Sequence, residues 1–83
     1  MKVRIHAHAL ERMGERGATA IEVIETVNEG EAFQAKFSRI GFRRNFLFHG
    51  KWRGRAYKTK QLEVYGVKAG GDFIAITVLV KYF

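Results

Sequence analysis

The chain of 83 residues contains neither cysteine nor proline. Without cysteine, no disulfide can hold the fold together and no thiolate can serve as a nucleophile or a metal ligand. The three histidines have no cluster of acidic partners, so the sequence predicts no metal site and no cofactor. Repeats, low-complexity segments and linker-like stretches are absent as well. We therefore expect a single domain over residues 1–83.

Long hydrophobic runs are also missing. The segment Met1–His6 has none of the apolar run that a signal peptide requires. The longest apolar stretch lies near the C-terminus and spans about ten residues, whereas a membrane-spanning helix needs roughly 20. We expect a soluble, cytoplasmic protein that has no membrane partner.

Acidic residues are scarce relative to basic ones. Fifteen Lys and Arg stand against eight Asp and Glu, which gives a formal net charge of +7. Such a field attracts anionic partners, and nucleic acid is the commonest of these. An acidic protein partner would be attracted by the same field, so the charge alone leaves both partners open.

Three kinds of catalytic motif are absent. The pair Gly70-Gly71 lacks the Lys-Ser/Thr and the helix that complete a phosphate loop. No serine stands in a nucleophile elbow, and no acidic pair is of the kind that holds Mg²⁺ in a two-metal nuclease. A nuclease built from this sequence would therefore act without a metal. It would use the 2′-hydroxyl of RNA as nucleophile, while His, Arg and Lys move protons and neutralise the phosphate.

Hydrophobic periodicity and turn residues predict two helices followed by strands. The first helix covers His6–Gly17 and ends at its glycine. The second starts at a capping box of Thr19 and Glu22 and closes near Gly30. Strands are expected over 31–38, 42–52, 57–68 and 73–83, with a hairpin turn at 69–72. The predicted fold class is α+β, with two N-terminal helices packed on a twisted antiparallel sheet of about four strands.

The same periodicities indicate which faces are buried. Leu10 and Met13 are expected to dock the first helix on the core. The second helix presents an apolar stripe formed by Ile21, Ile24 and Val27, with Val23 beside it. The last strand carries the longest apolar face, formed by Ile74, Ile76, Val78, Val80 and Tyr82. We place this strand in the middle of the sheet beneath the helices. A position near an edge, which would allow a homodimer instead of a monomer, stays open.

One row of the first helix carries chemistry. His8, Arg12 and Arg16 are spaced by four residues, so they lie above one another on one helical face. The two guanidinium groups repel each other unless an anion lies across them, and their planar donors fit a phosphate. An imidazole beside that phosphate can transfer a proton near neutral pH. The alternative is an ordinary solvated helix face, with Glu11 and Glu15 screening the arginines.

A second basic group lies in the later half of the chain. Its cations alternate with aromatic residues, a pattern typical of proteins that hold a nucleic-acid backbone and stack on unpaired bases. The predicted RNA-binding residues are Arg43, Lys51, Trp52, Arg53, Arg55 and Lys58. Single-stranded RNA fits better than duplex DNA, because no recognition-helix or zinc-finger pattern is present. The alternative is a charged hairpin that protects an edge strand from aggregation, with Trp52 buried against a helix.

Two stretches of the sequence resemble the signatures of a known family. The run His8–Gly17 (HALERMGERG), followed by a capped helix, is similar to the N-terminal motif of a family of small bacterial proteins catalogued as a domain of unknown function. Lys60–Tyr65 (KQLEVY), a glycine-rich turn and Ile76–Val78 are similar to its C-terminal motif. That family resembles a branch of the RelE/ParE-like toxin superfamily. The resemblance implies two N-terminal helices on a curved antiparallel sheet and a metal-independent endoribonuclease restrained by an antitoxin.

The resemblance also implies a set of catalytic residues, namely His8, Arg12, Arg16, Lys60 and Thr77. In the leading hypothesis, His8 is the general acid or base and Arg12 and Arg16 bind the scissile phosphate. Lys60 neutralises the developing charge, and Thr77 orients a phosphate oxygen. The protein would then be the ribonuclease toxin of a toxin–antitoxin pair, with RNA as substrate and an acidic antitoxin as partner. The second hypothesis is a non-catalytic basic module that docks on RNA or on an acidic protein.

Overall fold

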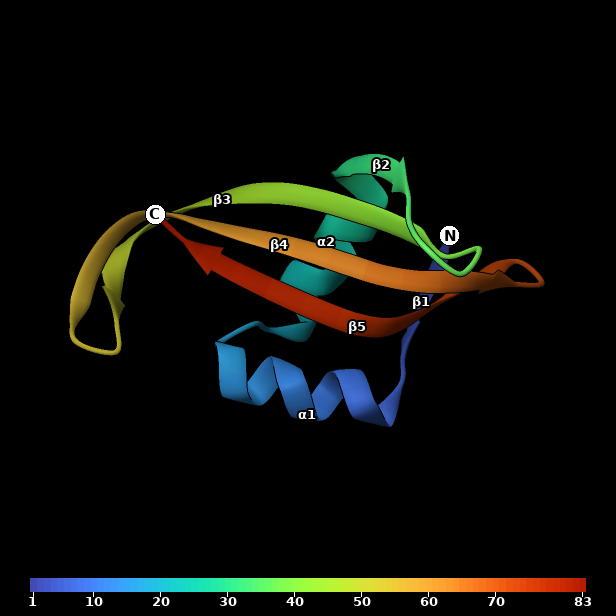
Figure 1. The fold of residues 1–83 in the computed structure, drawn as a ribbon, viewed down its shortest axis with the longest axis horizontal. Helices are drawn as coiled ribbons and strands as arrows, with labels where there is room; N and C mark the ends of the chain where they lie inside the picture. The colour runs from blue at the N-terminus through green and yellow to red at the C-terminus, as the bar shows by residue number, and fades with distance from the viewer.

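The computed structural model describes all 83 residues and confirms the α+β class (Figure 1). In chain order the elements are β1 (Lys2–Ile5), α1 (Ala7–Arg16), α2 (Ala20–Glu29), β2 (Glu31–Gln34), β3 (Ile40–Trp52), β4 (Arg55–Ala69) and β5 (Asp72–Tyr82). The strands form one sheet in the order β1-β5-β4-β3-β2. β5 therefore lies inside the sheet, between β1 and β4, and not at an edge. No helix is long and apolar enough to cross a membrane.

The sheet is mixed and has five strands, so the prediction of about four antiparallel strands was wrong in two respects. β1 was missed, and it pairs with β5 in parallel, with Val3 opposite Phe73. Four residues that alternate charged and apolar are too short to stand out as a periodic signal, and their partner strand lies at the other end of the chain. β2 is also shorter than predicted, because it ends at Gln34.

Both helices end where the local chemistry predicts, and α2 also begins at its predicted cap. In α1, His6 is the N-cap and its Nδ1 accepts the His8 backbone N–H at 3.1 Å. Gly17 ends α1 in the left-handed conformation, with φ of 79°. In α2, the capping box is complete: the Thr19 hydroxyl accepts the Glu22 N–H at 3.2 Å, and the Glu22 carboxylate accepts the Thr19 N–H at 2.9 Å.

The buried faces of the helices are rotated from the predicted ones. In α1, Ala9 and Met13 are buried while Leu10 is 53% exposed. In α2, the buried residues are Val23, Thr26 and Val27, whereas Ile21 and Ile24 are exposed. The prediction took the largest apolar side chains of each helix as the buried ones. Ala9 and Thr26 occupy core positions because a small side chain allows close packing and because the Thr26 hydroxyl donates to the Glu22 carbonyl at 2.7 Å.

The core face of β5 changes sides at Ile76, so the prediction of one continuous apolar face was wrong for Ile74 and Ile76. Phe73 and Ala75 are buried before this point and Val78 after it. The register between β4 and β5 shifts there, because Thr77 pairs with Tyr65 and Ala75 with Gly66. Ile76 is the extra residue of a bulge, which reverses the alternation of side chains along the strand.

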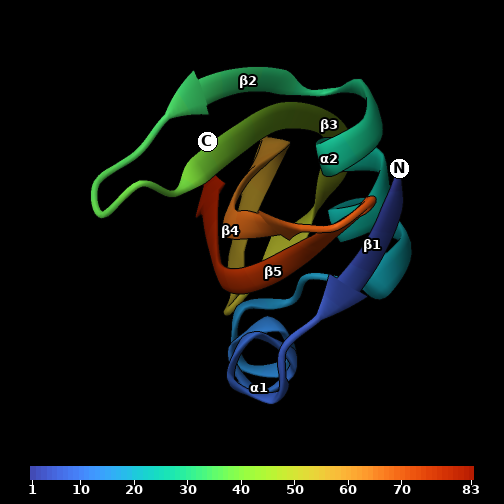
Figure 2. The ribbon, with the colours of Figure 1, turned by 90° about the vertical axis from the view of Figure 1, so that its right-hand side faces the viewer.

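The helices cover one face and one flank of the sheet. In Figure 1, α2 crosses behind β3 and β4, while α1 runs alongside β5; Figure 2 shows α1 end-on below β5. No helix crosses the near face of Figure 1, which we term the open face. Alternation and register assign to it the side chains of Arg43, Glu63, Tyr65, Thr77 and Leu79.

Candidate active site

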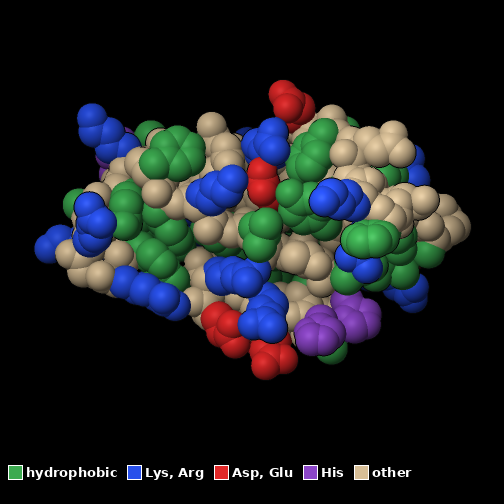
Figure 3. All heavy atoms as spheres, in the orientation of Figure 1, with side chains coloured by type: hydrophobic (Ala, Val, Ile, Leu, Met, Phe, Trp, Pro, Cys, Tyr) green, Lys and Arg blue, Asp and Glu red, His purple; other side chains and the backbone are tan.

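The predicted row of His8, Arg12 and Arg16 lies against β5 and lines a hollow of about 400 Å³. We term it the α1 hollow; its lining residues are His6, His8, Arg12, Arg16, Ile76, Thr77 and Leu79. Figure 3 shows histidine and basic side chains gathered over α1 on this face of the molecule. Four of the five residues implied by the family resemblance thus meet in one place, although Thr77 lies far from α1 in the sequence. The bulge at Ile76 sets the side of β5 on which Thr77 lies.

The charge of the α1 hollow is entirely basic, because no acidic residue lines it. Arg12 has one ionic contact, in which its Nη1 lies 3.4 Å from Glu15 Oε2, and both side chains are about half exposed. A contact of this kind on the surface is weak and leaves most of the guanidinium donors available. Arg16 is fixed instead, since its Nη1 donates to the Val78 carbonyl at 2.7 Å. The hollow therefore combines one oriented guanidinium with one that is able to adjust to an anion.

His6 also lines the α1 hollow, and sequence reasoning missed it. Its Nδ1 accepts the His8 N–H in the helix cap, so a neutral His6 carries its proton on Nε2. That Nε2–H can donate to an anion in the hollow. The rings of His6 and His8 are stacked with centroids 6.2 Å apart. The capping role would have been the only sequence signal, and histidine is an uncommon cap.

Lys60 lies outside this hollow, on the face of β4 that packs beneath the helices. Its side chain is 7% exposed, and its Nζ donates to Glu22 Oε1 at 2.8 Å and to the Gly17 carbonyl. Burial raises the pKa of Glu22, but the hydrogen bonds and charge from Lys60 and the Thr19 N–H lower it by more, so this pKa lies below its ordinary value. The Lys60 ammonium thus joins the C-terminal end of α1 to the start of α2.

The predicted RNA-binding residues are spread over two regions. Lys51, Arg55 and Lys58 are exposed on the β3–β4 hairpin, at the left end of Figure 1. Trp52 is half-buried: its ring is stacked on that of Tyr82 in β5, with centroids 5.1 Å apart, and lies against Gly17 at the end of α1. Arg53 covers the Trp52 ring and donates to the Glu15 carbonyl at 3.2 Å. The hairpin cations therefore do not line the α1 hollow.

Arg43, the remaining predicted RNA contact, lies on the open face in a polar cluster that sequence reasoning missed. It donates to Glu63 Oε2 at 2.8 Å, and the Tyr65 hydroxyl donates to Glu63 Oε1 at 3.2 Å. Burial raises the pKa of Glu63, but Arg43, Tyr65 and Lys81 lower it by more, so the carboxylate stays ionised below its ordinary range. Burial raises the pKa of Tyr65. Tyr65 lies beside Glu63 because the two alternate on one face of β4, but only the strand register brings Arg43 to them, and register cannot be read from one strand alone.

Metal ligands are not grouped in this chain. No cluster of three or more His, Cys, Asp or Glu side chains occurs. The two imidazoles of the α1 hollow have arginines, a threonine and apolar residues as their neighbours. The arrangement is suited to binding an anion and to moving a proton beside it.

Comparison of this chain with models of protein families, with curated proteins and with solved structures finds no match. The assignment of function therefore depends on the geometry of the α1 hollow and on the sequence signatures that fall within it.

Proposed function

We propose that this protein is a metal-independent endoribonuclease of the toxin type, with its catalytic centre in the α1 hollow. One observation supports it above the others: the helix row and Thr77, distant in sequence, surround one cationic hollow free of carboxylates. Two helices on a curved sheet also agree with the RelE-like architecture that the family resemblance implies, although the parallel strand β1 departs from it. The protein would act on cytoplasmic RNA and be restrained by an acidic antitoxin.

In the proposed reaction, Arg12 and Arg16 hold the non-bridging oxygens of the scissile phosphate, and the His6 Nε2–H and the Thr77 hydroxyl donate to the same group. His8 accepts the proton of the 2′-hydroxyl while the 2′-oxygen attacks phosphorus. The bond from phosphorus to the 5′-oxygen breaks, and this oxygen takes a proton from solvent water. A 2′,3′-cyclic phosphate remains, and His8 returns its proton to solvent. Lys60 has no direct part in this scheme; it supports the turn that ends α1.

The test is incubation of the purified protein with total RNA in EDTA. His8→Ala is the informative variant, and His49→Ala is its matched control, because His49 is exposed on β3 outside the α1 hollow. We expect the wild type and the His49 variant to cleave and the His8 variant to be inactive. Cleavage by the His8 variant at the wild-type rate would remove the catalytic centre from α1.

A second candidate function is a non-catalytic basic module. The exposed cations Lys51, Arg55 and Lys58 on the β3–β4 hairpin favour it, because they can bind an RNA backbone or an acidic protein without any reaction. A folded wild-type protein that retains RNA in an electrophoretic shift but leaves it intact would support this function. Growth arrest on expression, relieved by His8→Ala, would support the nuclease instead.

A further inference from the structure

A second hollow of about 440 Å³ adjoins the α1 hollow on the open face. We term it the loop hollow, since most of its wall comes from β2 and the segment that follows it. Its lining residues are Phe33, Gln34, Ala35, Lys36, Phe37, Arg39, Tyr65 and Thr77. Thr77 lines both hollows, so a ligand group held in one lies next to a group held in the other. No acidic residue lines the loop hollow.

The strand register explains why the two hollows meet. Phe33 pairs with Gly41, Gly41 with Tyr65, and Tyr65 with Thr77, so these four residues form one row across β2, β3, β4 and β5. Paired residues of neighbouring strands project on the same side of a sheet, about 5 Å apart. The aromatic wall of the loop hollow therefore begins one strand away from the threonine that we assign to the phosphate.

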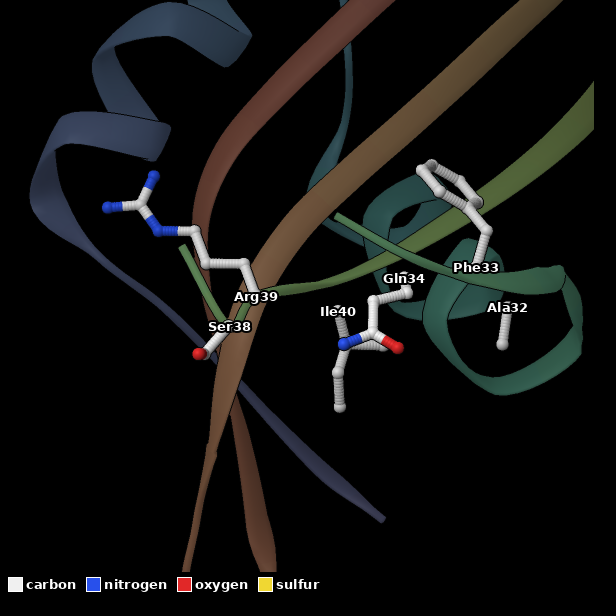
Figure 4. A pocket seen from close by; sticks show the side chains of 6 residues that line it. All are labelled: Ala32, Phe33, Gln34, Ser38, Arg39 and Ile40. Carbon is white, nitrogen blue, oxygen red and sulfur yellow. The ribbon is translucent and has the colours of Figure 1, made fainter. Parts of the chain in front are cut away.

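This aromatic wall is held in place before any ligand binds. The Phe33 and Tyr65 rings meet edge to face at 5.7 Å, and the Arg43 guanidinium lies 4.6 Å from the centre of the Phe33 ring. A Cβ at Gly41 would lie 2.4 Å from the Phe33 ring, so the ring rests directly on the backbone of β3. Figure 4 shows a neighbouring hollow at the sheet edge, which Phe33 and Arg39 line as well; in this view their side chains point upward, whereas those of Ala32 and Ile40 point downward.

Phe37 and Ser38 are the two central residues of the turn between β2 and β3, which the Arg39 N–H closes by donating to the Lys36 carbonyl at 3.3 Å. Phe37 is 85% exposed, and its φ of 61°, like the 56° of Ser38, is the left-handed value that both central residues of a type I′ turn adopt. A bulky side chain is strained there, and strained residues gather at ligand sites. An exposed ring recovers none of this strain through burial. Lys36 and Arg39, on either side of it, provide positive charge for an anionic ligand.

We propose that the loop hollow is a nucleobase subsite, in which an unpaired base of single-stranded RNA stacks on Phe37 beside Tyr65 while its phosphate occupies the α1 hollow. The inference rests on the proposed function for the identity of the ligand. Flat aromatic faces flanked by Lys and Arg suit a base and its backbone, and stacking of this kind accepts any base. A duplex would keep its bases stacked inside the helix, so the subsite selects single strands.

The test is fluorescence anisotropy with a labelled 2′-O-methyl oligonucleotide, which cannot be cleaved because its 2′-oxygen is blocked. Phe37→Ala is compared with Leu47→Ala, a matched control, because Leu47 is 83% exposed on β3 outside both hollows. We expect Phe37→Ala to weaken binding about tenfold, which corresponds to about 1.4 kcal/mol. Leu47→Ala should leave the affinity unchanged. A strand of equal length without bases should bind the wild type about tenfold more weakly than the base-containing strand does. The wild type and Phe37→Ala should bind this strand with equal affinity.

The outcomes separate this inference from the proposed nuclease. Equal affinity of the wild type and Phe37→Ala for the base-containing strand, or equal affinity of the wild type for the two strands, would overturn the subsite, even if unmodified RNA is cleaved. Phe37-dependent binding by a wild type that cleaves no RNA would support the subsite and overturn the nuclease. Absence of any binding to the probe would overturn the subsite.

Discussion

Lys60 and Arg12 are basic residues from the two sequence stretches that resemble family signatures, yet their surroundings differ. The Lys60 side chain is 7% exposed and its ammonium is bonded to Glu22 and to the Gly17 carbonyl. The Arg12 side chain is half exposed and has a single ionic contact, with Glu15, at 3.4 Å. A buried charge needs partners in the protein itself, whereas an exposed one can take them from a ligand. The Lys60 ammonium is thus paired within the fold, whereas the Arg12 guanidinium is available to bind an anionic ligand.

The largest expected effect concerns stability at Lys60. Lys60→Met keeps an apolar stem but leaves Glu22 and the Gly17 carbonyl without their partner, so the free energy of unfolding should fall by about 3 kcal/mol. Urea denaturation measures this. Lys58→Met, at an exposed position of the same strand, should change it by less than about 0.5 kcal/mol. Equal stability of the two variants would show that the buried pair contributes little.

The next effect is on catalysis at Arg12. Arg12→Ala should reduce RNA cleavage about a hundredfold, or about 2.7 kcal/mol, because a donor to the transition-state phosphate is lost. The melting temperature should not change, since the side chain is exposed. Arg4→Ala is the control, as Arg4 is an exposed arginine of β1 outside the α1 hollow. Unchanged cleavage after Arg12→Ala would take this residue out of the centre.

Acid pH should destabilise the paired sites. The pKa values of Glu22 and Glu63 lie below their ordinary value of 4.5 in the folded protein. Their ionisation therefore stabilises the fold above the ordinary value, and this stability is lost as pH falls from about 4.5 through the folded values. The urea concentration at the unfolding midpoint, measured between pH 7 and pH 3, should decrease below about pH 4.5. Glu22→Gln should make this decrease smaller. A profile that is unaltered in the variant would exclude Glu22 as a cause.

The smallest effect is expected at the exposed hairpin cations. Lys51→Ala and Arg55→Ala should each weaken RNA binding a few-fold and lower the slope of log affinity against log salt by about 0.7 to 1, because one phosphate contact is lost. Titrations at several salt concentrations measure this. A slope that stays the same in both variants would place the RNA elsewhere.

The parts of the site that sequence predicted are those with a local pattern. The helix row follows from spacing by four residues, and the N-terminal cap of α2 follows from Thr19 and Glu22. Thr77 entered through the family resemblance alone, since nothing near it in the sequence points to α1. The contact of Arg43 with Glu63 depends on strand register, and the reversal of β5 depends on a bulge at Ile76. Neither the register nor the bulge is marked by a recognisable pattern in the amino-acid sequence.

The two ends of α1 are attached to the rest of the protein by different means. At the C-terminal end, the Tyr82 hydroxyl donates to the Arg16 carbonyl at 2.9 Å, Arg16 donates to Val78, and Lys60 holds Gly17. At the N-terminal end, α1 follows β1 directly, and the His6 N–H donates to the Ala75 carbonyl at 2.9 Å, next to the pairing of β1 with β5. The C-terminal end of α1 is therefore held by hydrogen bonds from side chains, whereas the N-terminal end is held by backbone hydrogen bonds of the sheet. A single side-chain substitution can thus loosen the Arg16 end of α1, whereas the position of the histidine end is set by main-chain groups that no substitution of a side chain removes.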